Sequence, residues 1–281
     1  MPVIAVINRK GGSGKSTLAT HLAAWWAGLG QPVMLGDVDR QHSTRTWLRL
    51  RDARGLQPTA PIVGWASDTR QVLRPPAGIG RVVLDTPGGL RGSELARVVM
   101  SADAIVMPVC ASVFDRTSAA ECHDELMTLP RVSSGRCRLA AVGMRVDVRT
   151  RGAQVLQQWA AARGLPFVGV LRDTQAYVHC IEQGLTLFDL RADAVQADLA
   201  QWRPILDWLD PVLQGPVAAP AAARTAPPKP TVVARVSPAE AAQALEALVT
   251  RRGQGALPAP SRRGSGWFDW LTRPRRYERS S

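Results

Sequence analysis

The stretch that decides the fold is Val3-Ile4-Ala5-Val6-Ile7-Asn8-Arg9-Lys10-Gly11-Gly12-Ser13-Gly14-Lys15-Ser16-Thr17. A short apolar run leads into a glycine-rich segment, which leads into a pattern typical of a helix over 15–29. Glycines at such a turn let successive backbone N–H groups converge on phosphate oxygens, and the N-terminus of a helix adds partial positive charge. The order strand, glycine-rich loop and helix therefore predicts a phosphate-binding loop rather than a chance turn.

The loop also predicts its ligand, ATP with Mg²⁺. We expect Lys15 to reach the β- and γ-phosphates, the hydroxyl of Ser16 to ligate Mg²⁺, and Thr17 to contact the α-phosphate. The predicted nucleotide-binding residues are Gly11, Gly12, Ser13, Gly14, Lys15, Ser16 and Thr17.

Three aspartates follow apolar runs farther along the chain. Asp85 ends Arg81-Val82-Val83-Leu84, a position from which a carboxylate can hold Mg²⁺ directly or through water. Its alternative role is to cap the next turn, and the phosphate loop favours the metal. Asp37 and Asp39 end another apolar run, and because unpartnered buried carboxylates are costly, a polar or metal-rich site is expected there.

The first 210 residues alternate short apolar runs with helix-like segments, which predicts an α/β fold with a mostly parallel sheet flanked by helices. The runs are rich in Val, Ile and Leu, as strands buried on both faces should be. The predicted strands are 2–7, 32–37, 61–65, 80–85, 103–109, 138–144 and 166–170. The predicted helices are 15–29, 43–54, 91–100, 115–128, 151–163 and 193–209, and their tryptophans are expected to pack on the sheet.

The composition changes after Asp210. Residues 211–230 contain six prolines and many alanines, which indicates a semi-rigid linker and a largely disordered extension over 211–281. Within the extension, Ser237-Pro238-Ala239-Glu240 predicts a capped short helix over 238–252. The chain ends on an aromatic and basic segment that includes Trp267-Phe268-Asp269-Trp270-Leu271.

Charge narrows the set of partners. The chain carries 35 basic and 23 acidic residues, a formal net charge of +12, of which residues 211–281 contribute +7. Such an excess favours nucleic acid or an anionic membrane surface, although a GC-rich genome also raises arginine content. The four cysteines form no C-x-x-C pair and are expected to be reduced thiols, and no secretory signal or membrane-spanning run is recognised.

At this point the sequence resembles the ParA/MinD family of ATPases. Lys10-Gly11-Gly12-Ser13-Gly14-Lys15-Ser16-Thr17 is similar to the family's deviant Walker A motif, and Asp37-Val38-Asp39-Arg40-Gln41 resembles its D-x-D-P-Q segment. Val83-Leu84-Asp85-Thr86-Pro87 resembles its Walker B-like segment. Arg145-Val146-Asp147-Val148-Arg149-Thr150 and Leu171-Arg172-Asp173 resemble stretches of the partition proteins. The resemblance covers roughly residues 2–209 and is greatest for short ParA-type proteins, which lack a long N-terminal DNA-reading domain.

The resemblance implies a weak Mg²⁺-dependent ATPase, stimulated by a partner, that cycles between an ATP-bound dimer and an ADP-bound monomer. Lys10 would reach across the dimer to the partner's phosphates, and Gly11 would leave room for that subunit. Asp39 would orient the attacking water and share in the metal site, and Asp85 would support Mg²⁺. The family's proline after this aspartate is Arg40 here, a departure that puts the hydrolysis rate in doubt more than nucleotide binding.

The partition branch also implies non-specific DNA binding by the ATP dimer, and with it a cytoplasmic, nucleoid-associated bacterial protein. The candidate phosphate contacts are Arg145, Arg149, Arg151 and Arg172, for each of which a solvated surface charge is an equal alternative. The implied cargo is a plasmid, a chromosome or a large complex, and the implied partner is an adaptor or centromere-binding protein.

Two other classes of protein are alternatives to a DNA-binding partition ATPase. A MinD-like membrane-associated regulator would use the terminal aromatic and basic segment, which could equally bind a partner protein or have no role. A metabolic P-loop ligase or an iron–sulfur reductase is less favoured, because the sequence shows no substrate constellation and Cys110 and Cys137 are loosely placed.

Overall fold

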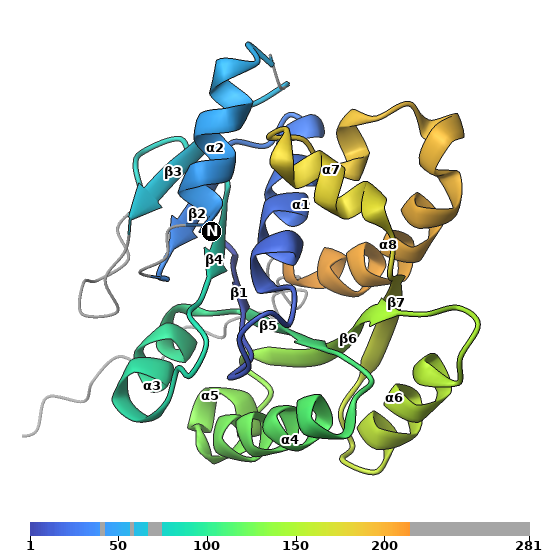
Figure 1. The fold of residues 1–281 in the computed structure, drawn as a ribbon. Coiled ribbons are helices and arrows are strands. Elements are labelled where there is room, and N and C mark those ends of the chain that lie inside the picture. The colour runs from blue at the N-terminus through green and yellow to red at the C-terminus, as the bar shows by residue number, and fades with distance from the viewer. Residues whose placement is uncertain (40–42, 57–58, 67–74, 214–281) are drawn as a thin grey trace, which may run out of the picture. The chain divides into compact units, whose positions relative to one another are not determined.

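The computed structural model describes residues 1–39, 43–56, 59–66 and 75–213, which build a sheet covered by helices on both faces (Figure 1). The strands run parallel in the order β3-β2-β4-β1-β5-β6-β7, which confirms the predicted α/β fold with a parallel sheet. They are β1 (Val3–Val6), β2 (Val33–Asp37), β3 (Ile62–Ala66), β4 (Arg81–Asp85), β5 (Ala104–Val109), β6 (Arg138–Val146) and β7 (Phe167–Arg172). Each predicted strand range overlaps one of them, but β3, β6 and β7 continue one or two residues past the predicted ends at 65, 144 and 170.

The helices divide between the two faces of the sheet. Helices α3, α4, α5 and α6 cover one face, and α1, α2, α7 and α8 cover the other. Their bounds are α1 (Lys15–Gly28), α2 (Ser43–Ala53), α3 (Gly92–Ser101), α4 (Val113–Thr128), α5 (Pro130–Ser133), α6 (Gly152–Ala161), α7 (Gln175–Glu182), the 3₁₀ helix η1 (Leu187–Asp189) and α8 (Ala192–Leu213). The sequence pattern missed α5, α7 and η1, which have four, eight and three residues and are shorter than the stretch of about 11 residues over which a helical period can be recognised.

Two buried clusters explain why the strands are continuously apolar. Along β1, Ile4 and Val6 pack in the cluster under α1 and α8, whereas Val3 and Ala5 pack in the cluster under α3 and α4. Successive side chains of a strand point to opposite faces, so a strand covered on both sides needs apolar residues at every position. The tryptophans predicted on the helices also pack in these clusters, and they are Trp25, Trp26, Trp159, Trp202 and Trp208.

Helix α8 continues to Leu213, three residues past the predicted end of the first domain. The proposed linker, the proposed helix over 238–252 and the terminal aromatic and basic segment lie outside the described residues. Within the described ranges, no helix combines the length and apolar character needed to cross a membrane.

The strand order places several loops at one edge of the sheet. β1 lies between β4 and β5, and Val6 is in register with Asp85, which is in turn in register with Asp37 on β2. The chain leaves β1 at this carboxyl edge, where the connections diverge to the two sides of the sheet. Ligands of open parallel sheets bind at such a point.

Candidate nucleotide-binding site

The glycine-rich loop joins β1 to α1 and depends on two glycines for its shape. Gly12 and Gly14 have φ angles of 72° and 94°, in the left-handed region that other residues rarely adopt. Gly14 is also the N-cap of α1, and a Cβ there would lie 2.6 Å from Cε of Met144. The loop can therefore turn directly into the helix, so that the helix N-terminus faces the loop.

Two polar groups beside the loop lack a protein partner. The buried hydroxyl of Ser13 and both carboxylate oxygens of Asp85 have no hydrogen-bond partner among the described residues. An unpaired donor inside a glycine-rich loop fits an anion, and an unpaired carboxylate nearby fits a cation. The residues present thus suit a phosphate group accompanied by a metal ion.

Lys15 supplies the positive charge inside the loop. Its side chain is buried, and its Nζ donates a hydrogen bond of 3.0 Å to the carbonyl oxygen of Lys10. Burial lowers the pKa of Lys15, while the charges of Asp85 and Asp39 oppose that effect. The ammonium group is therefore held by the loop itself and has carboxylates in its surroundings.

Asp85 has the more strongly shifted carboxyl group. Its pKa is raised to about 7, mainly by burial and also by the neighbouring Asp37 and Asp39, while Ser16 and Lys15 act in the opposite direction. The described residues contain no group of three His, Cys, Asp or Glu side chains that could hold a metal. A cation here would therefore take its remaining ligands from the Ser16 hydroxyl, a bound phosphate and water.

Asp37 and Asp39 have different surroundings, although the sequence places them two residues apart. Asp37 is fully buried and accepts hydrogen bonds from the hydroxyl of Thr44 at 2.7 Å and from the backbone N–H groups of Asp39 and Arg45 at 3.1 and 3.3 Å. These bonds tie the end of β2 to the first turn of α2, which explains the buried carboxylate without a metal. Asp39 instead lines the pocket beside the loop.

The loop borders two adjacent pockets. The first has a volume of about 410 Å³ and is lined by Gly11, Gly12, Gly14, Lys15, Ser16, Thr17, Asp39, Ser43, Pro87, Gly88 and Arg145. The second, of about 240 Å³, shares Gly14, Thr17 and Arg145 with the first. Most predicted loop residues and Asp39 therefore meet in one place, whereas Lys10 lines neither pocket.

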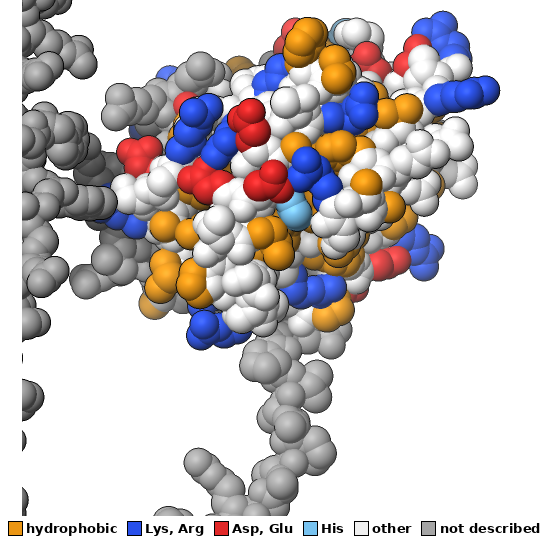
Figure 2. Space-filling view, turned by 90° about the horizontal axis from the view of Figure 1, so that it is seen from below, with side chains coloured by type: hydrophobic (Ala, Val, Ile, Leu, Met, Phe, Trp, Pro, Cys, Tyr) orange, Lys and Arg blue, Asp and Glu red, His pale blue; other side chains and the backbone are white. Residues whose placement is uncertain are grey.

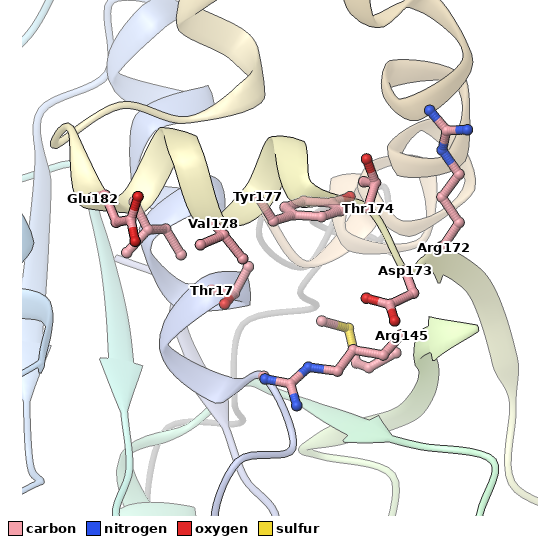
Figure 3. Close-up of a pocket in the computed structure, with 11 residues that line it drawn as sticks. Thr17, Arg145, Arg172, Asp173, Thr174, Tyr177, Val178 and Glu182 are labelled. Atoms are coloured by element: carbon pink, nitrogen blue, oxygen red, sulfur yellow. The ribbon is translucent and has the colours of Figure 1, made fainter. Parts of the chain in front are cut away.

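The second pocket was not predicted from the sequence. Figure 3 shows that its labelled residues come from the ends of β6 and β7, from α1 and from α7, with the ring of Tyr177 along one wall. The sequence of the turns after β6 and β7 indicated arginines that could contact DNA and a resemblance to partition proteins, but not the wall of a pocket. Their position after two parallel strands was the available signal, because such turns lie at the same edge as the phosphate loop.

Arg145 stands where the two pockets meet. It is the single non-glycine residue of the described ranges with a positive φ, at 50°. Backbone strain of this kind gathers at functional sites, where the surrounding structure holds it in place. The side chain is exposed, and it extends from the end of β6 toward the loop that precedes α1 (Figure 3).

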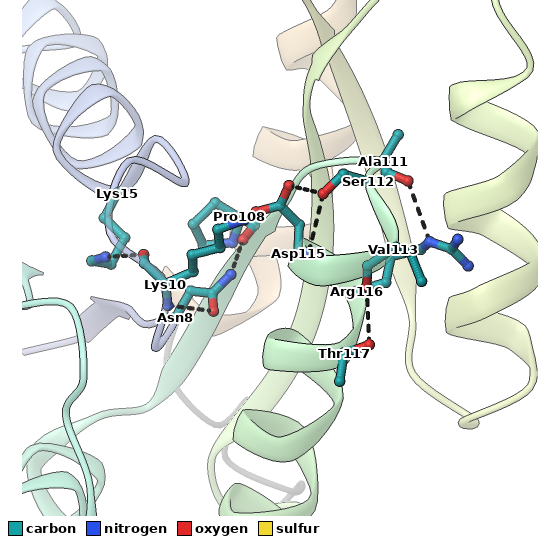
Figure 4. A network of polar contacts seen from close by, with 10 residues as sticks. All are labelled: Asn8, Lys10, Lys15, Pro108, Ala111, Ser112, Val113, Asp115, Arg116 and Thr117. Atoms are coloured by element: carbon teal, nitrogen blue, oxygen red, sulfur yellow. Dashed lines mark hydrogen bonds and ion pairs between the residues drawn. The ribbon is translucent and has the colours of Figure 1, made fainter.

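The two cations that precede the glycines are both paired with α4. Nζ of Lys10 lies 2.6 Å from Oδ1 of Asp115, and Arg9 contacts the carboxylates of Glu121 and Glu125 (Figure 4 shows the Lys10 pair). Hydrogen bonds from Lys10 and Ser112 outweigh the effect of partial burial and lower the pKa of Asp115. Lys10 and Lys15 are thus separated, one outside the loop and one inside it.

The four predicted DNA contacts lie around the ends of β6 and β7 but differ in their pairing. Arg149 is exposed and pairs with Asp147 at 2.8 Å, whereas Arg172 holds the carboxylate of Asp198 on α8 at 2.5 and 2.9 Å. Arg145 and Arg151 are exposed. Figure 2 views the molecule from the side of α4, α5 and α6, where basic and acidic side chains are interspersed, so the positive charge does not gather into one area there.

The fold and the loop define a P-loop nucleotide-binding protein. The family described as the CobQ/CobB/MinD/ParA nucleotide binding domain matches residues 4–187. The chain belongs to this family, as the motifs indicated.

Relatives with known roles agree with that membership. The maintenance of carboxysome distribution protein A of Gloeobacter kilaueensis is 32% identical over 212 residues, covering 74% of this chain and 94% of that protein. The chromosome-partitioning ATPase Soj of Thermus thermophilus is 32% identical over 187 residues, covering 55% of this chain and 73% of that protein. By their names, such relatives are partition and positioning proteins, and the family includes ATPases.

Solved structures show the same fold. The MinD cell division protein of Aquifex aeolicus has a TM-score of 0.57 at 17% identity, covering 74% of this chain and 98% of that one. An ATP complex of McdA from Cyanothece has a TM-score of 0.56 at 13% identity, covering 76% of this chain and 96% of that one.

Proposed function

We propose that this chain is an ATP-dependent positioning ATPase that forms a dimer around two nucleotides. In its ATP-bound state it binds DNA without sequence preference, and it thereby segregates or positions a plasmid, a chromosome or a large cellular complex. The single observation that carries the proposal is the separation of two lysines in one loop. Lys15 is buried against the loop's own carbonyl, and Lys10 extends outside both pockets. A loop with a second, outward lysine suits a site that another subunit completes.

Different side chains of the chain would bind the different parts of ATP and its Mg²⁺. The first pocket would hold the triphosphate, with the Ser13 hydroxyl and Lys15 binding its oxygens, and the second would hold the adenosine beside Tyr177. Ser16 and Asp85 would hold Mg²⁺, which supplies charge neutralisation of the β- and γ-phosphates. Asp39 would orient the attacking water, and Lys10 would stabilise the charge that develops on the partner's phosphates.

The test compares the two lysines. Lys15→Ala is expected to abolish ATP binding, whereas Lys10→Ala is expected to bind ATP normally but to lose dimer formation and hydrolysis. ATP affinity is measured by calorimetry, the oligomeric state by light scattering with ATP and with ADP, and turnover by phosphate release. Normal dimerisation and turnover of Lys10→Ala would overturn the proposal.

The proposal also implies a location, a partner and a cargo for this protein. A dimer that binds the nucleoid through exposed arginines would work in the bacterial cytoplasm, and a stimulating adaptor or centromere-binding protein would trigger hydrolysis. The relatives named for chromosome partition and for carboxysome distribution support a cargo that is large compared with the ATPase.

A further inference from the structure

Arg9, at the start of the phosphate loop, is connected through both its backbone and its side chain to the segment 86–91, which joins Asp85 to α3. We propose that Glu125 on α4 is a positioning residue that, together with Arg9, holds this segment in place as one wall of the first pocket. This inference rests on the proposed function, because its consequence is a change in ATP hydrolysis.

Three contacts close a ring between the phosphate loop, α3 and α4. The backbone N–H of Gly89 donates to the carbonyl of Arg9 at 2.6 Å. The backbone N–H of Gly92, the first residue of α3, donates to Oε1 of Glu125 at 2.6 Å. Oε2 of the same carboxylate accepts from the guanidinium of Arg9. One carboxylate therefore joins the start of α3 to the phosphate loop.

The surroundings of Glu125 favour its negative charge. The carboxylate lies at the N-terminus of α3, where the helix dipole is positive and where the N-cap residue Arg91 supplies no side-chain acceptor. The side chains of Arg9 and Glu125 are only 13% and 24% exposed, so salt screens this ion pair less than a pair on the open surface. Both terms strengthen the connection between α3 and the loop.

The segment 86–91 depends on such contacts because its backbone has unusual freedom. Gly89 and Gly92 have φ angles of 81° and 54°, in the left-handed region that favours glycine. The start of the segment is fixed by the hydroxyl of Thr86, which donates to the carbonyl of Val6 on β1 at 2.7 Å. The later part is held by the burial of Leu90 and by the bonds of the two glycines.

The position of this segment matters for the first pocket. Pro87 and Gly88 line that pocket, and a Cβ on Gly88 would lie 3.3 Å from the carbonyl of Arg9. Asp39, which is proposed to orient the attacking water, lines the same pocket. A displaced segment would therefore disturb the geometry of hydrolysis, whereas Lys15 and the loop would still bind the triphosphate.

Glu125→Gln tests the ring in the full chain. The variant keeps the shape of the side chain and an acceptor for Gly92 but removes the charge that binds Arg9. We expect kcat to fall about three- to tenfold, while KM for ATP changes less than about twofold.

Amide hydrogen exchange without nucleotide, measured by NMR, reports on the ring directly. In Glu125→Gln the amide of Gly89 should exchange roughly five- to tenfold faster, although its own acceptor on Arg9 is unaltered. A residue that only caps α3 would change exchange at Gly92 and leave Gly89 and kcat as they are. Unchanged exchange of Gly89, or an unchanged kcat, in a folded Glu125→Gln variant would overturn the proposal.

The matched control is Glu121→Gln, which removes the other α4 carboxylate beside Arg9. Glu121 is 59% exposed, lies 3.4 Å from the guanidinium and takes no part in the three contacts of the ring. This control should leave kcat and the exchange of Gly89 unchanged. If it lowers both as much as Glu125→Gln does, the charge near Arg9 matters and the ring does not.

The exchange measurement also separates this inference from the proposed function. If Lys10→Ala dimerises and turns over normally, the proposed function fails, but the exchange of Gly89 still decides whether Glu125 positions the segment. The double variant Arg9→Gln with Glu125→Gln should lose little more kcat than Glu125→Gln alone, because both changes break one contact. Fully additive losses would show that the two side chains act separately, against the ring.

Discussion

The imidazole of His21 stacks on the indole of Trp202, with ring centroids 5.2 Å apart and planes within 7° of parallel. His21 belongs to the helix that follows the phosphate loop, and Trp202 belongs to α8. The Nδ1 atom of His21 lies 2.8 Å from the carbonyl of Thr17, and its Nε2 accepts the backbone N–H of Leu187 at 3.2 Å. Trp202 in turn donates to the hydroxyl of Tyr177 at 3.1 Å, which connects the wall of the second pocket to α8.

His21 should make stability depend on pH. Burial lowers its pKa to about 4 in the folded chain, against about 6.5 in the unfolded chain. Between these values the unfolded chain binds a proton that the folded chain does not, so stability falls as pH decreases from about 6.5 to about 4. The expected loss from His21 is roughly 3 kcal/mol, measured by urea unfolding across this range.

The matched variant for this measurement is His21→Phe, which keeps an aromatic ring but cannot titrate. It should be less stable at pH 7 by about 1–3 kcal/mol because two hydrogen bonds are lost. The difference between the two stability curves isolates His21, since Asp85 titrates in both chains. If that difference is the same at pH 4 and pH 7, the protonation of His21 does not control acid stability.

Asp85→Asn should separate metal binding from folding. The folded chain keeps the carboxyl protonated up to a pKa of about 7, whereas the unfolded chain ionises near 4, so the carboxyl destabilises the fold increasingly as pH rises through this window. The amide should therefore raise stability at pH 8 by roughly 1–3 kcal/mol and have little effect at pH 4.

The same variant should lose the contribution of Mg²⁺ to ATP affinity. The unchanged chain is expected to bind ATP more tightly with Mg²⁺ than with EDTA, and Asp85→Asn should bind equally in both. Calorimetric titrations with and without the metal make the comparison. A preserved Mg²⁺ effect in a folded variant would exclude the metal role of Asp85.

Gly88 and Gly89 offer a paired test of the loop's surroundings. A Cβ on Gly88 would lie 3.3 Å from the carbonyl of Arg9 and from the backbone nitrogen of Gly11, so Gly88→Ala should displace the phosphate loop. ATP affinity is expected to fall about tenfold, because overpacking costs about 1–3 kcal/mol. Gly89 has a φ of 81° and open space around its Cβ position, so Gly89→Ala should cost stability but leave affinity unchanged.

Two arginines should respond differently in DNA-binding measurements. Arg151 is exposed, and Arg151→Ala is expected to weaken retention of random duplex in the presence of ATP and to reduce the salt slope of binding by about 1. Arg172 anchors the buried Asp198 of α8, so Arg172→Ala should mainly lower stability, by roughly 1–3 kcal/mol. Retention that is insensitive to salt in the unchanged chain would contradict the phosphate contacts altogether.

Local patterns made much of the fold predictable. Strands buried on both faces, such as β1 and β5, leave a continuous apolar run in the sequence, and the predicted ranges 2–7 and 103–109 contain these two strands. Helix α7 shows the limit of this approach. It has eight residues, and its place depends on Tyr177 and Cys180 packing against the cluster under α1 and α8. No period within eight residues can reveal a contact with a helix encoded far away in the chain.

The phosphate loop was determined by sequence alone, because its glycines and lysines act over one continuous segment whose shape follows from local backbone freedom. The sequence also placed Asp37, Asp39 and Asp85 at strand ends. Only the tertiary structure decided their different surroundings, with Asp37 hydrogen-bonded to α2 and Asp85 left without a protein partner among the described residues. It likewise decided that Lys10 meets Asp115, a contact across 105 positions that depends on how β1 and β5 lie side by side.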